Sequence, residues 1–298
     1  MNARKNAVAI GNFDGVHKGH QKLLDVLKTQ ADAMELNPVV YSFLKHPANV
    51  LKQDGTVKFI VDKETKTELL HMLGIQTVEI TDFNEVKDLS PDRFVKEILV
   101  DKLNASLVVI GENHRFGKNA AGDATMLKNL GKQYGFSVCT VSPYMENGVV
   151  CSSSVIREQI AQGNMEAASR LMGRNYQIKN EVIGGKQLGR TYDFPTANME
   201  MPIGQEVPAH GVYATTACID GVSYPAITNV GYTSFDKIKK ERVETHIIGF
   251  DGDLYRKELT IDFLKKMRDF IPFQSVEELV KQLSSDKKTR VKMTEGTR

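Results

Sequence analysis

The first half of the chain alternates short apolar runs with segments of helical periodicity. Buried-strand patterns lie at 7–10, 39–43, 78–80, 106–110 and 136–141. Helical spacing of apolar residues lies between them, at 21–27, 62–73, 91–103 and 124–134. Strands that alternate with helices are typical of a parallel sheet covered by helices. We therefore predict a doubly wound α/β domain, whose ligands bind at the carboxyl edge of its sheet.

The pattern changes after a predicted helix at 155–172. The next segment is rich in Gly, Thr, Val and Tyr, and alternating runs at 212–217, 223–227 and 244–248 predict strands of a small β-barrel. A helix at 276–283 closes this part, and the basic tail at 287–298 is predicted to be a solvated, partly disordered end. The length of 298 residues suits two domains, which we predict at 1–173 and 174–298.

Composition narrows the classes of function. The net charge of +2 is too small to indicate a nucleic-acid partner. No apolar run approaches the roughly 20 residues of a membrane span, and no signal-peptide core is visible, so we expect a cytoplasmic protein without a membrane partner. The separated Cys139, Cys151 and Cys218 lack metal-binding spacing and are expected to be packing residues. Nothing in the sequence predicts an oligomeric state.

The strongest chemical signal is GNFDGVHKGH at 11–20, directly after the first predicted strand. A glycine-rich turn at this place lets main-chain N–H groups approach phosphate, and the following helix start favours anions. His17 and His20 are three residues apart around Gly19, so both imidazoles can face one site and donate hydrogen bonds to a triphosphate. Paired histidines near a turn can also simply cap a helix. The spacing is not that of a zinc protease, and Walker A and GxGxxG motifs are absent.

These residues resemble the HxGH signature of the nucleotidylyltransferase superfamily. More narrowly, they resemble the opening motif of the prokaryotic bifunctional riboflavin kinase/FAD synthetase family. Further motifs follow in the family's order along nearly the whole chain: Phe43 with His46-Pro47, GENHRFG at 111–117, SSSVIR at 152–157, GRT at 189–191, FPTAN at 194–198, NVG at 229–231 and ETH at 244–246. The resemblance implies a parallel sheet of nucleotidylyltransferase type, followed by a riboflavin-kinase-like β-barrel with a C-terminal helix.

For the first domain, the resemblance implies adenylyl transfer from ATP to FMN with release of pyrophosphate. His17, His20 and Arg157 would be catalytic, with Arg157 as a bidentate phosphate clamp. The residues assigned to nucleotide or flavin binding are Gly11, Phe13, Asp14, Gly15, Gly19, Phe43, His46, Asn113, Arg115, Ser152, Ser153 and Ser154. A serine run before a helix otherwise serves as an N-cap, and a histidine before proline is equally typical of a turn.

Two departures touch this domain, because Val155 and Asn113 replace an arginine and an aspartate that are frequent in the family. We expect adenylyl transfer to survive them, since His17, His20 and Arg157 remain. Mg²⁺ is the expected cofactor because it would neutralise the triphosphate of ATP.

The second domain resembles riboflavin kinase, which transfers the γ-phosphate of ATP to riboflavin. By this match Thr196 and Asn198 serve the metal and phosphates, Glu244 is the base, and Gly189 and Arg190 contact the nucleotide. Several family positions are altered: Asn180, Asp193, Thr233-Ser234-Phe235, Gly249, Arg256 and Phe270. Aspartate in place of a glycine adds bulk and a like charge beside phosphate, so kinase activity is doubtful.

Other functions stay open at this point. The chain could be a fully bifunctional enzyme, a non-catalytic flavin-binding regulator, or another transferase of the superfamily, such as a pantetheine-phosphate or nicotinate-mononucleotide type. The His17/His20 pair and Arg157 argue against the regulator. The appended kinase-like half argues against the other transferases, which need no such domain.

Overall fold

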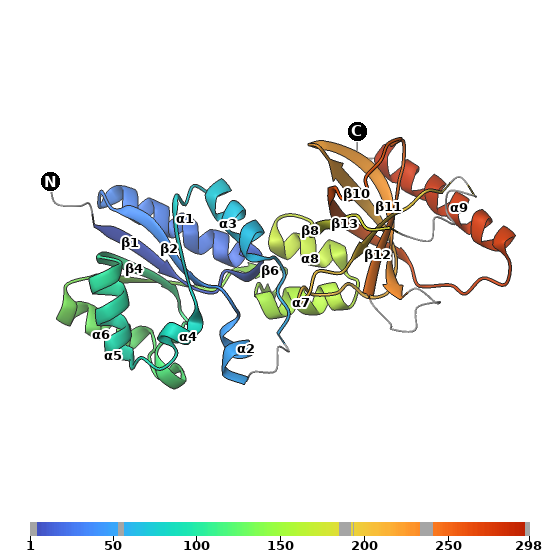
Figure 1. Cartoon of the computed structure of the whole chain (residues 1–298). Coiled ribbons are helices and arrows are strands. Elements are labelled where there is room, and N and C mark those ends of the chain that lie inside the picture. Colours follow the sequence, from blue (N-terminus) through green and yellow to red (C-terminus); the bar gives the residue numbers. More distant parts are fainter. Residues whose placement is uncertain (1–4, 53–56, 185–191, 193, 233–240, 296–298) are drawn as a thin grey trace. The chain divides into compact units, whose positions relative to one another are not determined.

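A parallel sheet forms the centre of the first half of the chain (Figure 1). The computed structural model describes residues 5–52, 57–184, 192, 194–232 and 241–295. The strand order is β3-β2-β1-β4-β5, and every neighbouring pair is parallel. The strands are β1 (Asn6–Ile10), β2 (Asn37–Phe43), β3 (Thr77–Thr81), β4 (Ala105–Gly111) and β5 (Ser137–Val141). The strand order reverses between β1 and β4, which places the predicted ligand edge beyond Ile10 and Gly111.

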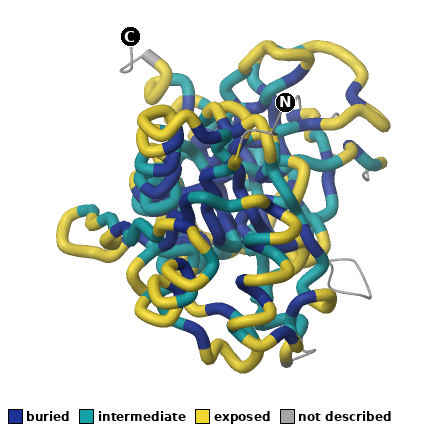
Figure 2. The backbone as a smooth tube through the Cα atoms, turned by 90° about the vertical axis from the view of Figure 1, so that its left-hand side faces the viewer, coloured by how far each residue is buried: buried dark blue, intermediate teal, exposed yellow. Residues whose placement is uncertain are grey.

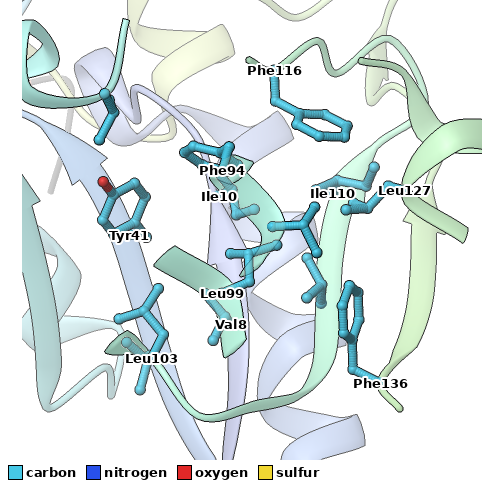
Figure 3. Packing of buried hydrophobic residues seen from close by; sticks show 14 of the residues in the cluster. Val8, Ile10, Tyr41, Phe94, Leu99, Leu103, Ile110, Phe116, Leu127 and Phe136 are labelled. Carbon is cyan, nitrogen blue, oxygen red and sulfur yellow. The ribbon is translucent and has the colours of Figure 1, made fainter. Parts of the chain in front are cut away.

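Helices cover both faces of this sheet, as predicted. One face packs against α1 (Lys18–Ala33) and α3 (Lys63–Met72) through Leu24, Leu27 and Leu70. The other face packs against α5 (Pro91–Phe94), the π-helix η2 (Val95–Lys102) and α6 (Ala124–Tyr134), with Tyr41, Leu99 and Leu127 in its core (Figure 3). Shorter elements are η1 (Asp14–Val16), α2 (Pro47–Lys52), α4 (Phe83–Val86), η3 (Lys118–Ala120), β6 (Met145–Glu146) and β7 (Val149–Val150). Buried residues therefore gather along the strands and the inner helix faces (Figure 2).

The single helix predicted at 155–172 is wrong, because two helices occupy this stretch. They are α7 (Ser153–Ala161) and α8 (Met165–Met172), separated at Gly163, whose φ of 79° ends the first of them. The α8 helix packs against β8 and β13 of the second sheet. The chain folds as two compact units, residues 1–155 and 156–298, and the assignment of separate activities to 1–173 and 174–298 stays a prediction.

The second unit contains an antiparallel sheet with the order β8-β13-β10-β11-β12-β9. Its strands are β8 (Tyr176–Glu181), β9 (Ala197–Glu200), β10 (Gly211–Ile219), β11 (Val222–Tyr232), β12 (Glu241–Ile247) and β13 (Glu258–Arg268). The Ile183 N–H donates to the Asn198 carbonyl at 2.8 Å, and Asn180 Nδ2 donates to the Glu200 carbonyl at 2.9 Å. These bonds join the two edges of the sheet and give the nearly closed barrel that was predicted.

The C-terminal helix α9 extends over Val276–Glu295, so the predicted end at 283 is wrong. Residues 287–295, predicted to belong to a solvated, partly disordered end, are helical. Asp286 is buried and binds Arg268 through a contact of 2.8 Å. Arg290 is 4% exposed and donates from Nε and Nη2 to the Thr215 carbonyl at 3.0 and 2.9 Å. Two charged residues one helical turn apart therefore attach α9 to the barrel. Within the described ranges, no helix is long and apolar enough to cross a membrane.

Replacing Arg290 with alanine should lower the free energy of unfolding of the second unit by about 1.5–3 kcal/mol, the usual net contribution of a hydrogen bond that involves a charged group. Urea denaturation followed by circular dichroism measures the change. Lys288→Ala is the matched control, because Lys288 is exposed on the same helix. Equal effects of the two substitutions would show that the Arg290 contact with the barrel contributes nothing specific.

Candidate functional site

The turn after β1 contains left-handed backbone conformations, one of which requires a glycine. The Gly11 N–H donates to the Tyr41 carbonyl at 3.1 Å, which ties the start of the turn to β2. Phe13 is buried with a φ of 51°, and Gly15 has a φ of 78°. A Cβ atom on Gly15 would lie 2.9 Å from the Ile60 side chain, so glycine is required there for both space and conformation.

The carboxylate of Asp14 supports the same turn from inside. Asp14 is buried, and its Oδ1 accepts a hydrogen bond of 2.9 Å from the Ile60 N–H. The contact connects η1 to the segment that leads into α3. The turn is therefore held at the carboxyl edge of the sheet, where the sequence predicted a phosphate-binding loop.

His17 and His20 lie face to face at the start of α1. Their rings stack with centroids 3.6 Å apart and an interplanar angle of 18°. His17 Nδ1 accepts from the His20 N–H at 3.3 Å, so the neutral ring carries its proton on Nε2. A Cβ on Gly19 would lie 3.1 Å from the His17 ring, so glycine at this position leaves room for the pair. His17 thus caps the helix through Nδ1 while its ring stacks on that of His20.

His20 is held as a neutral imidazole. Burial lowers the pKa of His20 well below its usual value, and the neighbouring His17 and Lys66 lower this pKa further. Its Nδ1 atom is buried and has no hydrogen-bond partner in the part of the chain that the structure describes. An unsatisfied buried nitrogen costs about 1–3 kcal/mol, which a bound ligand oxygen could offset.

A short hairpin, β6 and β7, connects the histidine motif to the predicted serine loop. Lys18 Nζ lies 3.1 Å from Glu146 Oε2, and the Tyr144 hydroxyl donates to the same oxygen at 2.7 Å. Cys151 is buried, and its Sγ lies 3.5 Å from His17 Nδ1. Cys151 therefore packs as predicted, but it does so directly against the histidine pair.

The serine loop contacts the turn as well. Ser153 Oγ donates to the Asp14 carbonyl at 2.9 Å. Ser152 Oγ accepts from the Val155 N–H at 3.4 Å, which is the N-cap contact that the sequence left as an alternative. This accepting role leaves the Ser152 hydroxyl proton available as a donor. Ser154 is exposed in the first turn of α7. Two motifs more than a hundred residues apart are therefore in direct contact.

Two other predicted pocket residues have structural contacts of their own. Phe43 is buried and packs edge-on against Tyr41 and Phe83, with ring centroids 5.6 and 5.2 Å apart. His46 Nδ1 accepts from the Ala48 N–H at 3.2 Å at the start of α2, as a turn histidine does. The flavin-binding or nucleotide-binding roles of Phe43 and His46 stay predictions.

The remaining predicted residues of the first site lie on two elements. Asn113 and Arg115 are exposed in the loop that follows β4, and Arg115 lies 3.8 Å from Asp123. Because β4 and β1 are parallel neighbours, this loop leaves the same edge of the sheet as the histidine motif. Arg157 is half-buried on α7 in the second compact unit, and its role as a phosphate clamp stays a prediction.

Sequence reasoning missed Lys66, which lies on α3. Its side chain is 6% exposed, and Nζ donates to the Asn12 carbonyl, Ser42 Oγ and the Phe43 carbonyl at 3.3, 3.1 and 2.9 Å. Burial lowers the pKa of Lys66 to about 8, and the Asp14 carboxylate opposes this shift. The available signal was its position four residues before the buried Leu70, on the apolar face of the predicted helix.

In the barrel, the predicted kinase residues come together. Asn198 on β9 lies directly opposite Glu244 on β12, and such pairs have Cβ atoms about 4.5–5.5 Å apart. Asn198 Nδ2 donates to the Thr196 carbonyl at 3.2 Å and lies 3.5 Å from Thr196 Oγ1. Gly189 and Arg190 lie outside the described residues, as do Asp193 and the 233–235 segment.

His246 is a further side chain that the sequence analysis quoted but did not assign. Its Nδ1–H donates to the Pro195 carbonyl at 2.9 Å, and its ring lies 5.1 Å from that of Phe194. Burial lowers the pKa of His246, and the charge of Lys287 adds to the shift, so the ring is neutral near pH 7. His246 therefore fixes the FPTAN segment that carries Thr196.

Three of the altered kinase positions, among the residues that the structure describes, have defined surroundings. Asn180 forms the barrel-closing bond to Glu200, and Phe270 is exposed by 58%. Arg256 has a φ of 62°, a left-handed conformation that costs a residue with a side chain roughly 1–2 kcal/mol. Its N–H donates to the Val182 carbonyl at 2.9 Å, which holds the turn in place.

Comparison with known families finds two matches along the chain. A family described as FAD synthetase matches residues 1–155, and a family described as riboflavin kinase matches residues 172–294. The first match contains the histidine motif and the start of the serine loop. The second contains Thr196, Asn198 and Glu244.

Similar curated proteins cover almost the whole chain. The bifunctional riboflavin kinase/FMN adenylyltransferase of Bacillus subtilis is 34% identical over 97% of this chain and 92% of its own length. The protein of the same name from Escherichia coli K12 is 31% identical over 95% of this chain and 90% of its own length. A solved structure from Streptococcus pneumoniae, described as a macrolide-efflux protein, has a TM-score of 0.89 and 29% identity and covers 97% of this chain and 95% of its own.

Proposed function

This chain belongs to the bifunctional riboflavin kinase/FMN adenylyltransferase family, and we propose that it makes FAD by moving the adenylyl group of ATP onto FMN. One observation carries the proposal for the first unit: the stacked His17/His20 pair at the start of α1, with a buried Nδ1 on His20 that has no partner among the described residues. Such a pair at the carboxyl edge of a parallel sheet suits the binding of a triphosphate.

The proposed reaction needs positioning and charge stabilisation rather than a covalent nucleophile. An oxygen of the FMN phosphate forms a bond to the α-phosphorus of ATP, and the bond to the bridging oxygen of pyrophosphate breaks. Negative charge therefore grows on the departing pyrophosphate. The imidazoles of His17 and His20, the Ser152 hydroxyl and the start of α1 would donate hydrogen bonds to that charge, with Arg157 as a further cation.

Mg²⁺ is part of the proposal, as a neutralising charge on the ATP phosphates. The described residues include no group of three or more His, Cys, Asp or Glu side chains that could hold a metal ion by themselves. This suits Mg²⁺, which is held mainly by substrate phosphates, water and one or two protein oxygens. In the barrel, Thr196 Oγ1 and the amide oxygen of Asn198 are hard donors of the required kind, and they would hold the ion there.

We propose riboflavin phosphorylation as the second activity, carried by the barrel. The observation that favours it is the direct pairing of Asn198 and Glu244 across β9 and β12. Glu244 would accept the proton of the riboflavin hydroxyl while that oxygen bonds to the γ-phosphorus and ADP leaves. The relatives are named for both activities, so the doubt raised by the altered positions is not confirmed.

One assay tests both halves. Purified protein is incubated with ATP and Mg²⁺ plus either FMN or riboflavin, and the flavins are separated by chromatography. We expect FAD and an equal amount of pyrophosphate from FMN, and FMN and ADP from riboflavin. Flavin binding without either product would favour the non-catalytic regulator. The cytoplasmic location remains part of the proposal.

A further inference from the structure

The Lys66 ammonium is buried under the histidine turn with a complete set of acceptors. Its three donors match three oxygens, those of the Asn12 carbonyl, the Ser42 hydroxyl and the Phe43 carbonyl. Lysine is rarely buried to this extent, because removing its charge from water is costly. The buried ammonium therefore has a specific role here, which is to hold these three oxygens together.

The three acceptors belong to the edge where the proposed substrate binds. Asn12 lies inside the GNFDGVHKGH motif, and Ser42 and Phe43 are the last residues of β2. Ser42 Oγ also donates to the Asn12 carbonyl, at 3.0 Å, so that oxygen is held by two donors. Lys66 thus connects the carboxyl ends of β1 and β2 at the residue before Phe13, where the backbone enters its left-handed conformation.

Titratable groups from three elements interact with Lys66. Asp14 of η1 is the attractive partner, and Lys63 on the same helix is repulsive. His20 of α1 is close enough for the ammonium to oppose protonation of its ring. The positive charge therefore acts on His20 and has the Asp14 carboxylate as its attractive partner.

We propose that Lys66 is a positioning residue for adenylyl transfer, which fixes the Asn12 turn and supplies a positive charge close to His20. The inference rests on the proposed function of the first unit. It differs from the assigned roles because Lys66 acts through the turn and the histidines.

The protonated form is the competent one, which gives a pH signature. Below its pKa of about 8, Lys66 donates three bonds and carries its charge. As the pH rises through that value, the neutral amine keeps two donors and loses the charge, so kcat/KM for ATP should fall. An arginine at this position stays charged throughout, and its profile should lack this alkaline limb.

The test uses the full chain with Lys66→Met, Lys66→Arg and the control Lys63→Met, which removes an exposed lysine from the same helix. FAD formation is measured from pH 6.5 to 9.5, with circular dichroism as the check on folding. We expect Lys66→Met to lower kcat/KM about 100-fold, the effect of a displaced binding turn. We expect Lys66→Arg to keep measurable activity without the alkaline limb. We expect Lys63→Met to keep the wild-type rate near neutral pH and to retain the alkaline limb, shifted to higher pH because a repulsive charge is removed.

The outcomes separate the two levels of the argument. A wild-type chain that makes no FAD overturns the proposed function itself. A wild type that makes FAD, with Lys66→Met equal to it in rate and pH profile, overturns the role of Lys66 alone. If Lys66→Met does not fold, the pH profiles of the wild type and of Lys66→Arg decide. The inference is overturned if the wild type shows no alkaline limb, or if Lys66→Arg retains one.

Discussion

Replacing His20 with alanine is expected to lower kcat/KM for FAD formation by about 100- to 1,000-fold, the usual loss when one transition-state hydrogen-bond donor is removed. The ring lies 3.6 Å from that of His17, and its buried Nδ1 has no partner among the described residues. Alanine at position 20 keeps the main-chain N–H that donates to His17 Nδ1, so the start of α1 is retained. Initial rates of FAD formation from FMN and ATP measure the effect.

The pH dependence of the wild type gives a second test of the same residue. The pKa of His20 is well below 6.5, so the ring stays neutral as the pH falls through the range where an ordinary histidine gains a proton. Because kcat/KM reports groups of the free enzyme, it should show no acid limb near pH 6.5 from this residue. A limb there that His20→Ala removes would contradict the assigned neutral state.

The control for this substitution is His210→Ala, which removes an exposed histidine from the second unit. It should leave FAD formation unchanged. Riboflavin phosphorylation by the His20→Ala protein shows, in the same sample, that the other unit is intact. Equal rates for the wild type and His20→Ala would show that the histidine pair does not act on ATP.

The strands and the binding turn of the α/β unit could be predicted from the sequence because their signals are local. The apolar runs that became β1, β2 and β4 are buried on both faces, so each run is continuous and easy to recognise. The glycines of the first motif predicted a tight turn, and the structure gives the reason at Gly15, which has a φ of 78° and lies against Ile60. Patterns within a few residues therefore located the turn and the helix that follows it.

The parts that were missed depend on partners far away in the chain. The segment from Lys287 onward looks like a solvated tail, but Arg290 finds the Thr215 carbonyl, 75 residues earlier. Lys66 looks like an ordinary helix lysine, and only the fold shows its bonds to Asn12 and Phe43. Buried charge is recognisable when its partners are known, and a single sequence does not pair them.

The strand β13 is a different kind of miss. Leu259, Ile261 and Phe263 alternate with polar residues and are all buried, which is the pattern of a half-buried strand. Lysines later in the strand mask this alternation. The period-two pattern at 259–263 is nonetheless a local signal for this strand, which lies between β8 and β10 in the sheet.

Replacing Glu244 with glutamine should lower riboflavin phosphorylation by about 100- to 10,000-fold, the range for loss of a general base. Glutamine keeps the shape of the side chain but cannot accept the proton of the riboflavin hydroxyl. FAD formation from supplied FMN should be unchanged, because the histidine site lies in the other compact unit. FMN and ADP formed from riboflavin and ATP measure the first effect, and FAD formed from FMN measures the second.

Glu181→Gln is the matched control, because Glu181 is an exposed carboxylate on β8 of the same barrel. Undiminished phosphorylation in Glu244→Gln would exclude Glu244 as the base. A wild type that makes FAD but no FMN would give a different answer. The pairing of Asn198 with Glu244 would then be insufficient, and the cause would lie in the altered positions of the second unit, such as Arg256 and Phe270. The two measurements together therefore show whether the barrel still carries the chemistry for which its relatives are named.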